Sequence, residues 1–256
     1  MRKPLCIDLF CGLGGWTEGF LAEGYEVVGF DIEQHAYGTE RYPAHLVLQD
    51  VLTIHGKQFK DADIIVASSP CQAYSYMAMP WTRAKQIARA LRGEGDFPDG
   101  YDGYRTIEEL NALFEAPKRI QREAIEAAGR FIPMIQENVR GAIPWVGRSA
   151  WNFGSYHLWG DVPALMPMTV KARKNGGNGS WFYGAAATGG NPARGVSVGE
   201  AGTKTVGHVN KRDGHGHTRH KSLARKAASA RIAKIPFPLA SHIARVYHPT
   251  LATEAA

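Results

Sequence analysis

Apolar residues are concentrated in four short runs in the first third of the chain, each of which ends at a glycine turn, an acidic residue or a serine–proline step. The runs cover residues 5–10, 25–33, 45–51 and 61–69. The segment between the first two, residues 16–24, has the composition of a helix. Strands that alternate with helices at this spacing predict a parallel sheet with right-handed crossovers.

The pattern continues less regularly downstream. Helical spacing is found over 116–132 and 239–247, a fifth strand ends at 134–138, and 151–167 is rich in strand-forming residues. Residues 81–116 are polar and rich in turn formers, so they predict a long loop. Residues 171–222 are rich in Gly, Asn and Lys and carry little pattern. The sequence therefore predicts an α/β fold, a mostly parallel sheet with helices on both faces.

Charge is distributed unevenly along the chain. The net charge is +6, but the segment from Lys171 to Lys234 holds thirteen Lys and Arg against two acidic residues, a net +11. The remainder therefore carries −5. A mildly acidic core with a basic arm is the electrostatic footprint of a nucleic-acid-binding protein.

Cysteine usage and hydropathy narrow the class further. Three cysteines without a pairing pattern argue against a disulfide framework and for a reducing, cytoplasmic location. The chain has no run of about 18 apolar residues, so no membrane span is expected, and residues 1–15 do not resemble a signal peptide. No Cys-x-x-Cys or His-Glu-x-x-His spacing occurs, so no metal is expected. The histidines at 208, 215, 217 and 220 are interpreted as part of a polar loop.

A glycine-rich turn, CGLGG, follows the first predicted strand. Its glycines allow a ligand to approach the backbone closely at the start of a helix. The second strand ends at Asp31, about twenty residues later, which suits a carboxylate that binds ribose hydroxyls. Asp50 follows the third strand and is placed to accept from an adenine amino group. These features predict a nucleoside-cofactor site; the alternative is an ordinary tight turn beside solvated acids.

The fourth strand ends in SSPCQAYSYM, which places Cys71 just beyond a proline. A thiolate is a strong nucleophile near neutral pH once its pKa is lowered. Glu137, in QENVRG, ends the fifth strand, and a carboxyl of raised pKa can protonate a ring nitrogen. Together these groups suit chemistry on a pyrimidine, although a buried cysteine and a solvated glutamate explain the same residues.

Three motifs, DLFCGLGGWTEGF, SSPCQAYSYM and QENVRG, occur in this order. They resemble the cofactor turn, the Pro-Cys-Gln nucleophile loop and the Glu-Asn-Val strand end of DNA (cytosine-5)-methyltransferases, and the chain looks like a compact, divergent member of phage or prophage type. The resemblance implies a Rossmann-like S-adenosylmethionine-dependent methyltransferase fold. It also implies a catalytic domain at 1–167, a small basic target-recognition region at 168–233, and a C-terminal helix at 234–256 that returns to the catalytic domain.

The resemblance further implies roles for individual residues. Cys71 would attack C6 of a flipped cytosine, Glu137 would hold N3, and Asn138 would support the nucleophile loop. S-adenosylmethionine would donate the methyl group and leave as S-adenosylhomocysteine, without a metal. Glu33 is a second candidate for the ribose, and Gln72 matches the nucleophile loop. The expected cofactor-binding residues are Phe10, Gly12, Leu13, Gly14, Asp31, Ile32, Asp50, Val51 and Pro70.

Two departures from the family pattern concern the substrate. The Gln-x-Arg-x-Arg motif is missing, so Arg148 is the candidate for contact with the target base, and the usual Gly-Asn-Ser start of the last motif is replaced by a segment with Ser241. The expected partner is double-stranded DNA, bound by a monomer, with a cognate restriction endonuclease as a possible companion. An RNA cytosine methyltransferase and a non-catalytic DNA-binding relative are the alternatives.

Overall fold

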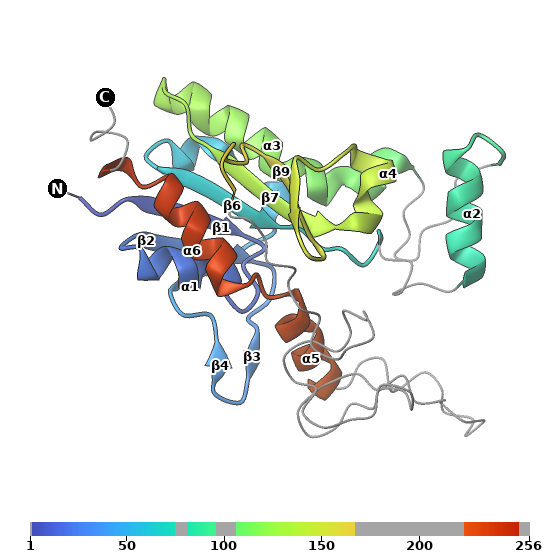
Figure 1. Cartoon of the computed structure of the whole chain (residues 1–256), viewed down its shortest axis with the longest axis horizontal. Helices are drawn as coiled ribbons and strands as arrows, with labels where there is room; N and C mark the ends of the chain where they lie inside the picture. Colours follow the sequence, from blue (N-terminus) through green and yellow to red (C-terminus); the bar gives the residue numbers. More distant parts are fainter. Residues whose placement is uncertain (1, 75–80, 96–105, 167–222, 251–256) are drawn as a thin grey trace.

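A seven-stranded sheet forms the centre of the molecule (Figure 1). The structure is a computed structural model and describes residues 2–74, 81–95, 106–166 and 223–250. The strand order is β5-β2-β1-β6-β7-β9-β8. The first five of these strands are parallel, and β9 and β8 are antiparallel to their neighbours. The predicted α/β fold with a mostly parallel sheet is confirmed. The strands are β1 (Leu5–Leu9), β2 (Glu26–Asp31), β5 (His45–Leu48), β6 (Ile64–Ser68), β7 (Met134–Val139), β8 (Trp151–Phe153) and β9 (Tyr156–Gly160).

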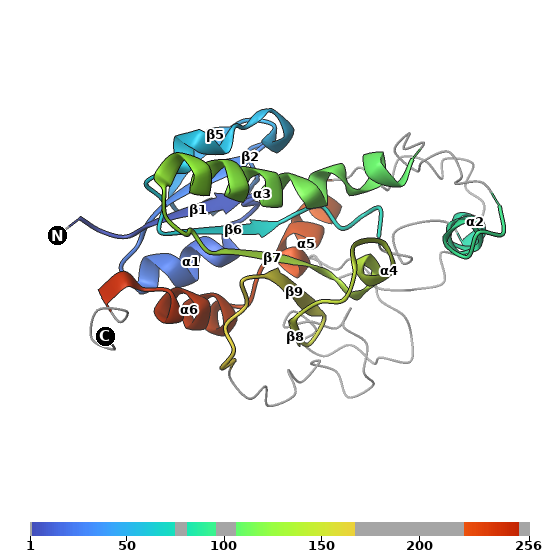
Figure 2. The same ribbon diagram turned by 90° about the horizontal axis from the view of Figure 1, so that it is seen from above.

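Helices cover both faces of the sheet (Figure 2). Helices α1 (Gly15–Ala22) and α6 (Phe237–Val246) lie on one face, and α3 (Ile107–Ala128) lies on the other. Helices α1 and α6 are in close contact: a Cβ atom added to Gly19 would lie 2.4 Å from the Cβ of Ala240. A larger residue at position 19 would therefore force the two helices apart.

The central strand β6 shows why the sheet is buried on both sides. Residues 64–67 are fully buried, as expected for a parallel strand covered by helices on each face. Ile64 and Val66 pack in the core beneath α1 and α6, whereas Ile65 and Ala67 pack in the core beneath α3. The continuous apolar run in the sequence thus supplies two cores at once.

The strand order reverses between β1 and β6. From β1 the chain adds β2 and then β5 on one side, and it then returns to the other side of β1 to add β6 and then β7. In open α/β sheets, ligands bind beyond the carboxyl ends of the strands at such a switch point. Here those ends carry the glycine turn after β1 and the Ser-Pro-Cys segment after β6.

The prediction of a long loop over 81–116 was wrong. Helix α2 spans Trp81–Leu91, and α3 already begins at Ile107. The hydroxyl of Thr106 caps α3 by accepting from the backbone N–H of Glu109 at 3.1 Å. Buried residues at helical spacing, Leu110 and Phe114, lie before Pro117, which the helix accommodates in its interior. The polar composition concealed a helix whose apolar stripe is narrow.

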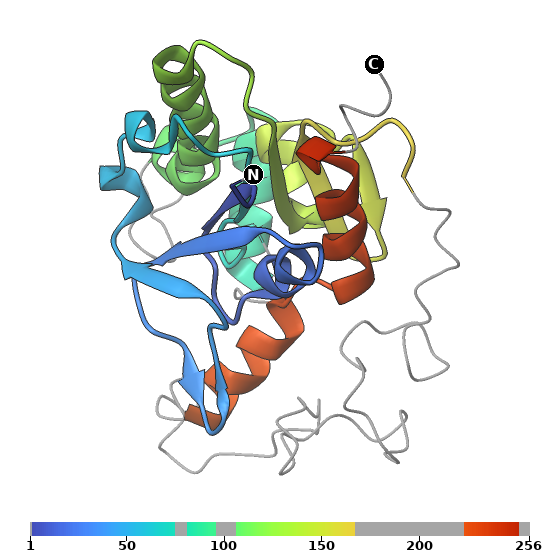
Figure 3. The same cartoon turned by 90° about the vertical axis from the view of Figure 1, so that its left-hand side faces the viewer.

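Several short elements were not predicted. Strands β3 (Ala36–Tyr37) and β4 (Glu40–Arg41) form a separate hairpin, and helix α5 (Leu223–Ala233) lies at the end of the basic region. Figure 3 shows α5 next to this hairpin. The rest of that region, residues 167–222, lies outside the described residues, together with its four histidines.

Helix α5 and the residue that follows it place basic side chains against acidic ones. Lys226 pairs with Glu33 at 3.4 Å and Arg231 with Glu40 at 2.7 Å, and Lys234 pairs with Glu18. Part of the positive charge of the basic region is therefore balanced locally. Within the described ranges, no helix is both long and apolar enough to cross a membrane.

Candidate active site

The glycine turn after β1 has an unusual backbone. Phe10 adopts a positive φ of 57°, and Gly12 and Gly14 have φ values of 52° and 77°. A positive φ at a phenylalanine costs free energy, and such strain concentrates at functional sites. Gly14 is the N-cap of α1, so the turn leads directly into a helix N-terminus. Leu13 is buried against Tyr37 and Ala227 of α5.

Asp31, at the end of β2, is hydrogen-bonded to the backbone of this turn. Its carboxylate accepts from the backbone N–H of Gly12 at 2.9 Å and of Glu33 at 3.2 Å, and it pairs with His35 at 3.5 Å. Burial alone would raise the pKa of Asp31, but the hydrogen bonds from His35 and the backbone hold it below its usual value. A carboxylate has about four acceptor positions, so these contacts leave roughly one for a ligand. Glu33 is the more exposed of the two acids.

Three large apolar side chains are exposed just after β2, at the end of β5 and in the 3-10 helix Val51–Thr53 that follows β5. Ile32 is 74% exposed, Leu48 58% and Leu52 46%, and Leu48 is the register partner of Asp31. We call these three residues the apolar shelf. A Cβ atom on Gly12 would meet nothing within 4 Å, so the turn also has open space beside it. An exposed apolar shelf next to an acid and an open glycine turn fits an adenine nucleoside.

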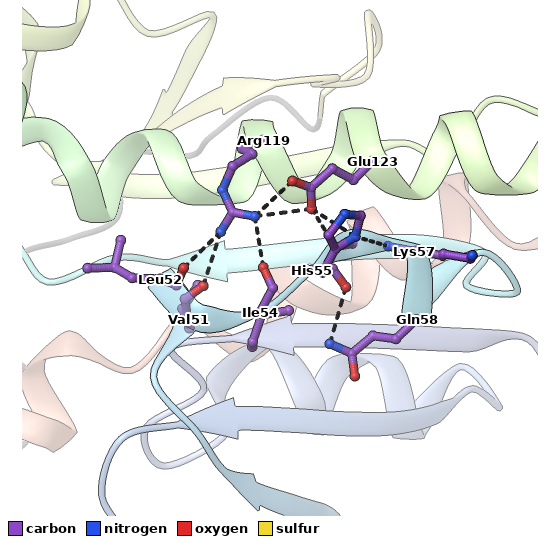
Figure 4. A network of polar contacts seen from close by, with 9 residues as sticks. Val51, Leu52, Ile54, His55, Lys57, Gln58, Arg119 and Glu123 are labelled. Atoms are coloured by element: carbon purple, nitrogen blue, oxygen red, sulfur yellow. Dashed lines mark hydrogen bonds and ion pairs between the residues drawn. The ribbon is translucent and has the colours of Figure 1, made fainter.

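Asp50 lies in a segment that helix α3 holds in place (Figure 4). Asp50 caps the 3-10 helix Val51–Thr53 by accepting from the N–H of Leu52 at 2.9 Å. Arg119 donates to the carbonyls of Ile54 at 2.8 Å, Leu52 at 3.3 Å and Val51 at 3.5 Å. Glu123 orients Arg119 through a pair at 3.0 Å. This arginine therefore fixes the backbone that presents Asp50.

We expect Arg119→Ala to lower the free energy of unfolding by about 1–3 kcal/mol, because several hydrogen bonds from one charged donor are lost and the carbonyls face a partly buried gap. Equilibrium unfolding in urea measures this change. Arg122→Ala, at an exposed position of the same helix, is the control and should change stability by less than about 0.5 kcal/mol. Equal losses in the two variants would show that the contacts with residues 51–54 contribute little.

Cys71 lies just beyond the end of β6, in a turn closed by a hydrogen bond from the N–H of Tyr74 to the carbonyl of Cys71 at 3.1 Å. Burial, and secondarily the charge of Glu137, raise the pKa of the Cys71 thiol to about 11. Cys71 therefore lies within electrostatic reach of Glu137. In the protein alone, the thiol is protonated at neutral pH.

Glu137 lies in β7, the strand next to β6, two residues before its end and directly opposite Ser68 in the register. It is 8% exposed. Burial raises the pKa of its carboxyl to about 8, although a hydrogen bond with Ser68 acts in the opposite direction. At neutral pH this carboxyl is therefore mostly protonated and can donate a hydrogen bond.

Asn138 points to the opposite face of β7 and holds the segment that leads to Cys71. Its side-chain amide donates to the carbonyl and to the hydroxyl of Ser69, each at 3.0 Å. Gln136, on the same face, donates to the Ser69 hydroxyl at 3.1 Å and to the carbonyl of Phe114 at 2.9 Å. All three polar side chains are buried. The backbone before Pro70 is consequently fixed to β7 and α3.

Within the described part of the chain, the remaining residues predicted for the site make no side-chain hydrogen bond or ion pair with Cys71, Glu137 or Asp31. Arg148 is exposed on the loop between α4 (Ile143–Val146) and β8, Pro70 is exposed beside Cys71, and Val51 is buried. Ser241 on α6 bonds with Glu23 of α1, an interaction within the helix pair.

Sequence reasoning missed a buried polar cluster beneath the glycine turn. Thr17 donates to the carboxyl of Asp8 at 2.6 Å, and its hydroxyl lies 2.7 Å from that of Tyr42. Burial raises the pKa of Asp8 to about 7. Asp8 belongs to the DLF motif, so the signal was a charged residue inside an otherwise apolar strand. Among the described residues, no group of three His, Cys, Asp or Glu side chains could hold a metal ion.

Comparisons with known proteins bear on the family of this chain. Residues 5–84 match the C-5 cytosine-specific DNA methylase family. No curated protein matches the chain. Two similar solved structures are a DNA modification methyltransferase encoded within a prophage of E. coli, at 21% identity with a TM-score of 0.34, and the methyltransferase EhMeth of Entamoeba histolytica, at 15% identity with a TM-score of 0.33.

These structural overlaps are partial. They cover 55% and 57% of this chain but only 33% and 41% of the two solved chains, and overlaps this limited do not bear on the substrate. The matched segment contains the glycine turn, Asp31, Asp50 and the nucleophile loop with Cys71. Over residues 5–84 this chain therefore matches the C-5 cytosine-specific DNA methylase family, and the resemblance drawn from its motifs is confirmed there.

Proposed function

We propose that the chain is a DNA (cytosine-5)-methyltransferase that acts on a cytosine flipped out of double-stranded DNA. The observation that carries the proposal is that Cys71, just beyond the end of β6, lies within electrostatic reach of Glu137 on the neighbouring strand β7, whose buried carboxyl is mostly protonated at neutral pH. Addition to a pyrimidine ring requires two groups, a nucleophile and a proton donor.

The reaction begins when the Cys71 thiol loses its proton to solvent and its sulfur forms a bond to C6 of the ring. Glu137 protonates N3 as the C5–C6 double bond is consumed, so electron density gathers at C5. After C5 has gained a methyl group, a base removes the C5 proton, the C6–sulfur bond breaks to release the Cys71 thiolate, and N3 returns its proton to Glu137. Because Glu137 is neutral near pH 7, it does not oppose the negative charge that must form on Cys71.

S-adenosylmethionine, when bound, supplies the methyl group. The apolar shelf, represented by Ile32, would pack against the adenine, and Asp50 would accept from its amino group. Asp31 would take one ribose hydroxyl with its remaining acceptor position, and the exposed Glu33 would take the other. The other proposed contacts come from the glycine turn and the nucleophile loop, at Phe10, Gly12, Leu13, Gly14, Val51 and Pro70.

A transfer assay tests the proposal. The chain would be incubated with tritiated S-adenosylmethionine and either mixed-sequence duplex DNA or bulk tRNA. We expect label in duplex DNA, and bisulfite sequencing of that DNA should locate 5-methylcytosine in one sequence context. Label in tRNA alone would assign the chain to RNA, and label in neither nucleic acid, with cofactor binding intact, would leave a non-catalytic binding protein.

A further inference from the structure

Ser68, the neighbour of Glu137 in the sheet, is hydrogen-bonded to a residue of the helix that follows the glycine turn. Ser68, the last residue of β6, is the direct register partner of Glu137, so the two side chains lie on the same face of the sheet. The indole Nε1 of Trp16 donates to the Ser68 hydroxyl oxygen at 3.0 Å. Trp16 is the second residue of α1, immediately after the glycine turn, and is 1% exposed.

The direction of these hydrogen bonds follows from their chemistry. An indole nitrogen can only donate, so the Ser68 oxygen is the acceptor of the first bond. The single hydroxyl proton of Ser68 is then available to the Glu137 carboxyl, which lies opposite Ser68 on the same face of the sheet, and a bond from Ser68 lowers the pKa of that carboxyl. A donated bond favours the charged form of a carboxyl, and a hydroxyl that is itself accepting a bond is a stronger donor.

We propose that Trp16 and Ser68 form a hydrogen-bonded relay that orients the Glu137 carboxyl. Both are positioning residues that act through Glu137. The inference rests on the proposed role of Glu137 as the proton donor to the base. Without the relay, burial would raise the pKa of the Glu137 carboxyl without opposition, and the carboxyl would lose its proton to solvent only at a higher pH.

Two other titratable groups lie near Glu137 and must be separated from the relay. Cys71 and Tyr156 each have a pKa raised by burial and by the charge of Glu137. The Tyr156 hydroxyl is engaged with the backbone carbonyls of Ile232 and Lys234, each at 3.1 Å. A direct measurement on the Glu137 carboxyl distinguishes its own titration from theirs.

The test uses the full chain labelled with 13C at the glutamate side-chain carboxyl carbons, titrated by NMR without DNA or cofactor. Loss of one signal in Glu137→Gln identifies the carboxyl. We expect Ser68→Ala to raise its titration midpoint by about one pH unit and Trp16→Phe to raise it by a smaller amount. The double variant should shift no further than Ser68→Ala alone, because both changes break one chain of contacts.

Ser69→Ala is the matched control. Its hydroxyl binds Gln136 and Asn138 on the opposite face, so its loss should leave the Glu137 midpoint unchanged. Ser68→Thr, which keeps a hydroxyl, should restore the native midpoint. An unchanged midpoint in Ser68→Ala, or an equal shift in Ser69→Ala, would overturn the relay; if Ser68→Ala does not fold, an unchanged midpoint in Trp16→Phe overturns it.

This titration is independent of methyl transfer. If neither DNA nor tRNA is methylated but the midpoint moves as expected, the proposed function fails and the relay stands. If transfer to DNA occurs and the midpoint does not move, the function stands and the relay fails. Where both hold, the alkaline limb of the transfer rate in Ser68→Ala should move upward with the midpoint.

Discussion

Replacing Cys71 with serine should reduce methyl transfer at least about 10³-fold while leaving the affinity for S-adenosylmethionine within about twofold of the native value. A serine hydroxyl is a far weaker nucleophile than a thiolate, and the proposed reaction has no other group that adds to C6. The side chain lies beyond the end of β6 and outside the three cores formed around the sheet, so the change should not disturb the fold. Tritium transfer and calorimetric titration with the cofactor measure the two effects.

A thiol elsewhere in the chain provides the control. Cys6 is fully buried in β1, so Cys6→Ala removes a thiol without touching the proposed site and should preserve transfer. Duplex DNA that carries 5-fluorocytosine should form a covalent complex with the native chain, because fluorine at C5 cannot leave as a proton and Cys71 is not released. A complex of equal yield with Cys71→Ser would contradict the assignment of the nucleophile.

Glu137→Gln should lower kcat/KM for DNA by about 10²–10⁴-fold, the usual contribution of a positioned acid. A glutamine amide can still donate a hydrogen bond to N3, but it cannot transfer a proton. The native rate should also decline as pH rises through about 8, because the protonated carboxyl is present below its raised pKa and is lost above it. That decline should be absent from the residual activity of Glu137→Gln.

Initial rates between pH 6 and pH 9.5 provide the measurement, with cofactor and DNA concentrations varied at each pH. Glu126→Gln, an exposed substitution on α3, is the control and should reproduce the native profile. A decline that persists unchanged in Glu137→Gln would have to come from another group, and the acid role would then be rejected.

The glycine turn, the nucleophile loop and the strand-end acids could be located from the sequence because each depends on local rules. A glycine turn after an apolar run, and a Ser-Pro-Cys step after another, occur at strand ends wherever they stand in a parallel sheet. The extent of α3 could not be located in this way. The polar, turn-rich composition of residues 81–116 predicted a loop there, yet Leu110 and Phe114 extend the helix by packing against the molecule's interior.

The partners of Glu137 illustrate the same limit. Nothing near Ser68 or Trp16 in the sequence indicates that they meet, since they are separated by 52 positions. Their contact exists because α1 packs on one face of the sheet, and the side chains of Ser68 in β6 and Glu137 in β7 lie on that same face. Likewise, Arg119 reaches residues 51–54 only because α3 covers the opposite face.

By itself, the sequence determined the class of fold and the order of its main strands along the chain, and it supplied the candidate reactive groups, because periodicity, turn chemistry and motif residues are local properties. Only the tertiary structure decided the protonation of those groups and their support. Burial at the end of β7 raises the pKa of the Glu137 carboxyl to about 8, and Asn138 ties the Cys71 segment to that strand. Both effects arise from residues distant in the chain, whose desolvation and hydrogen bonding depend on how the sheet and its helices pack.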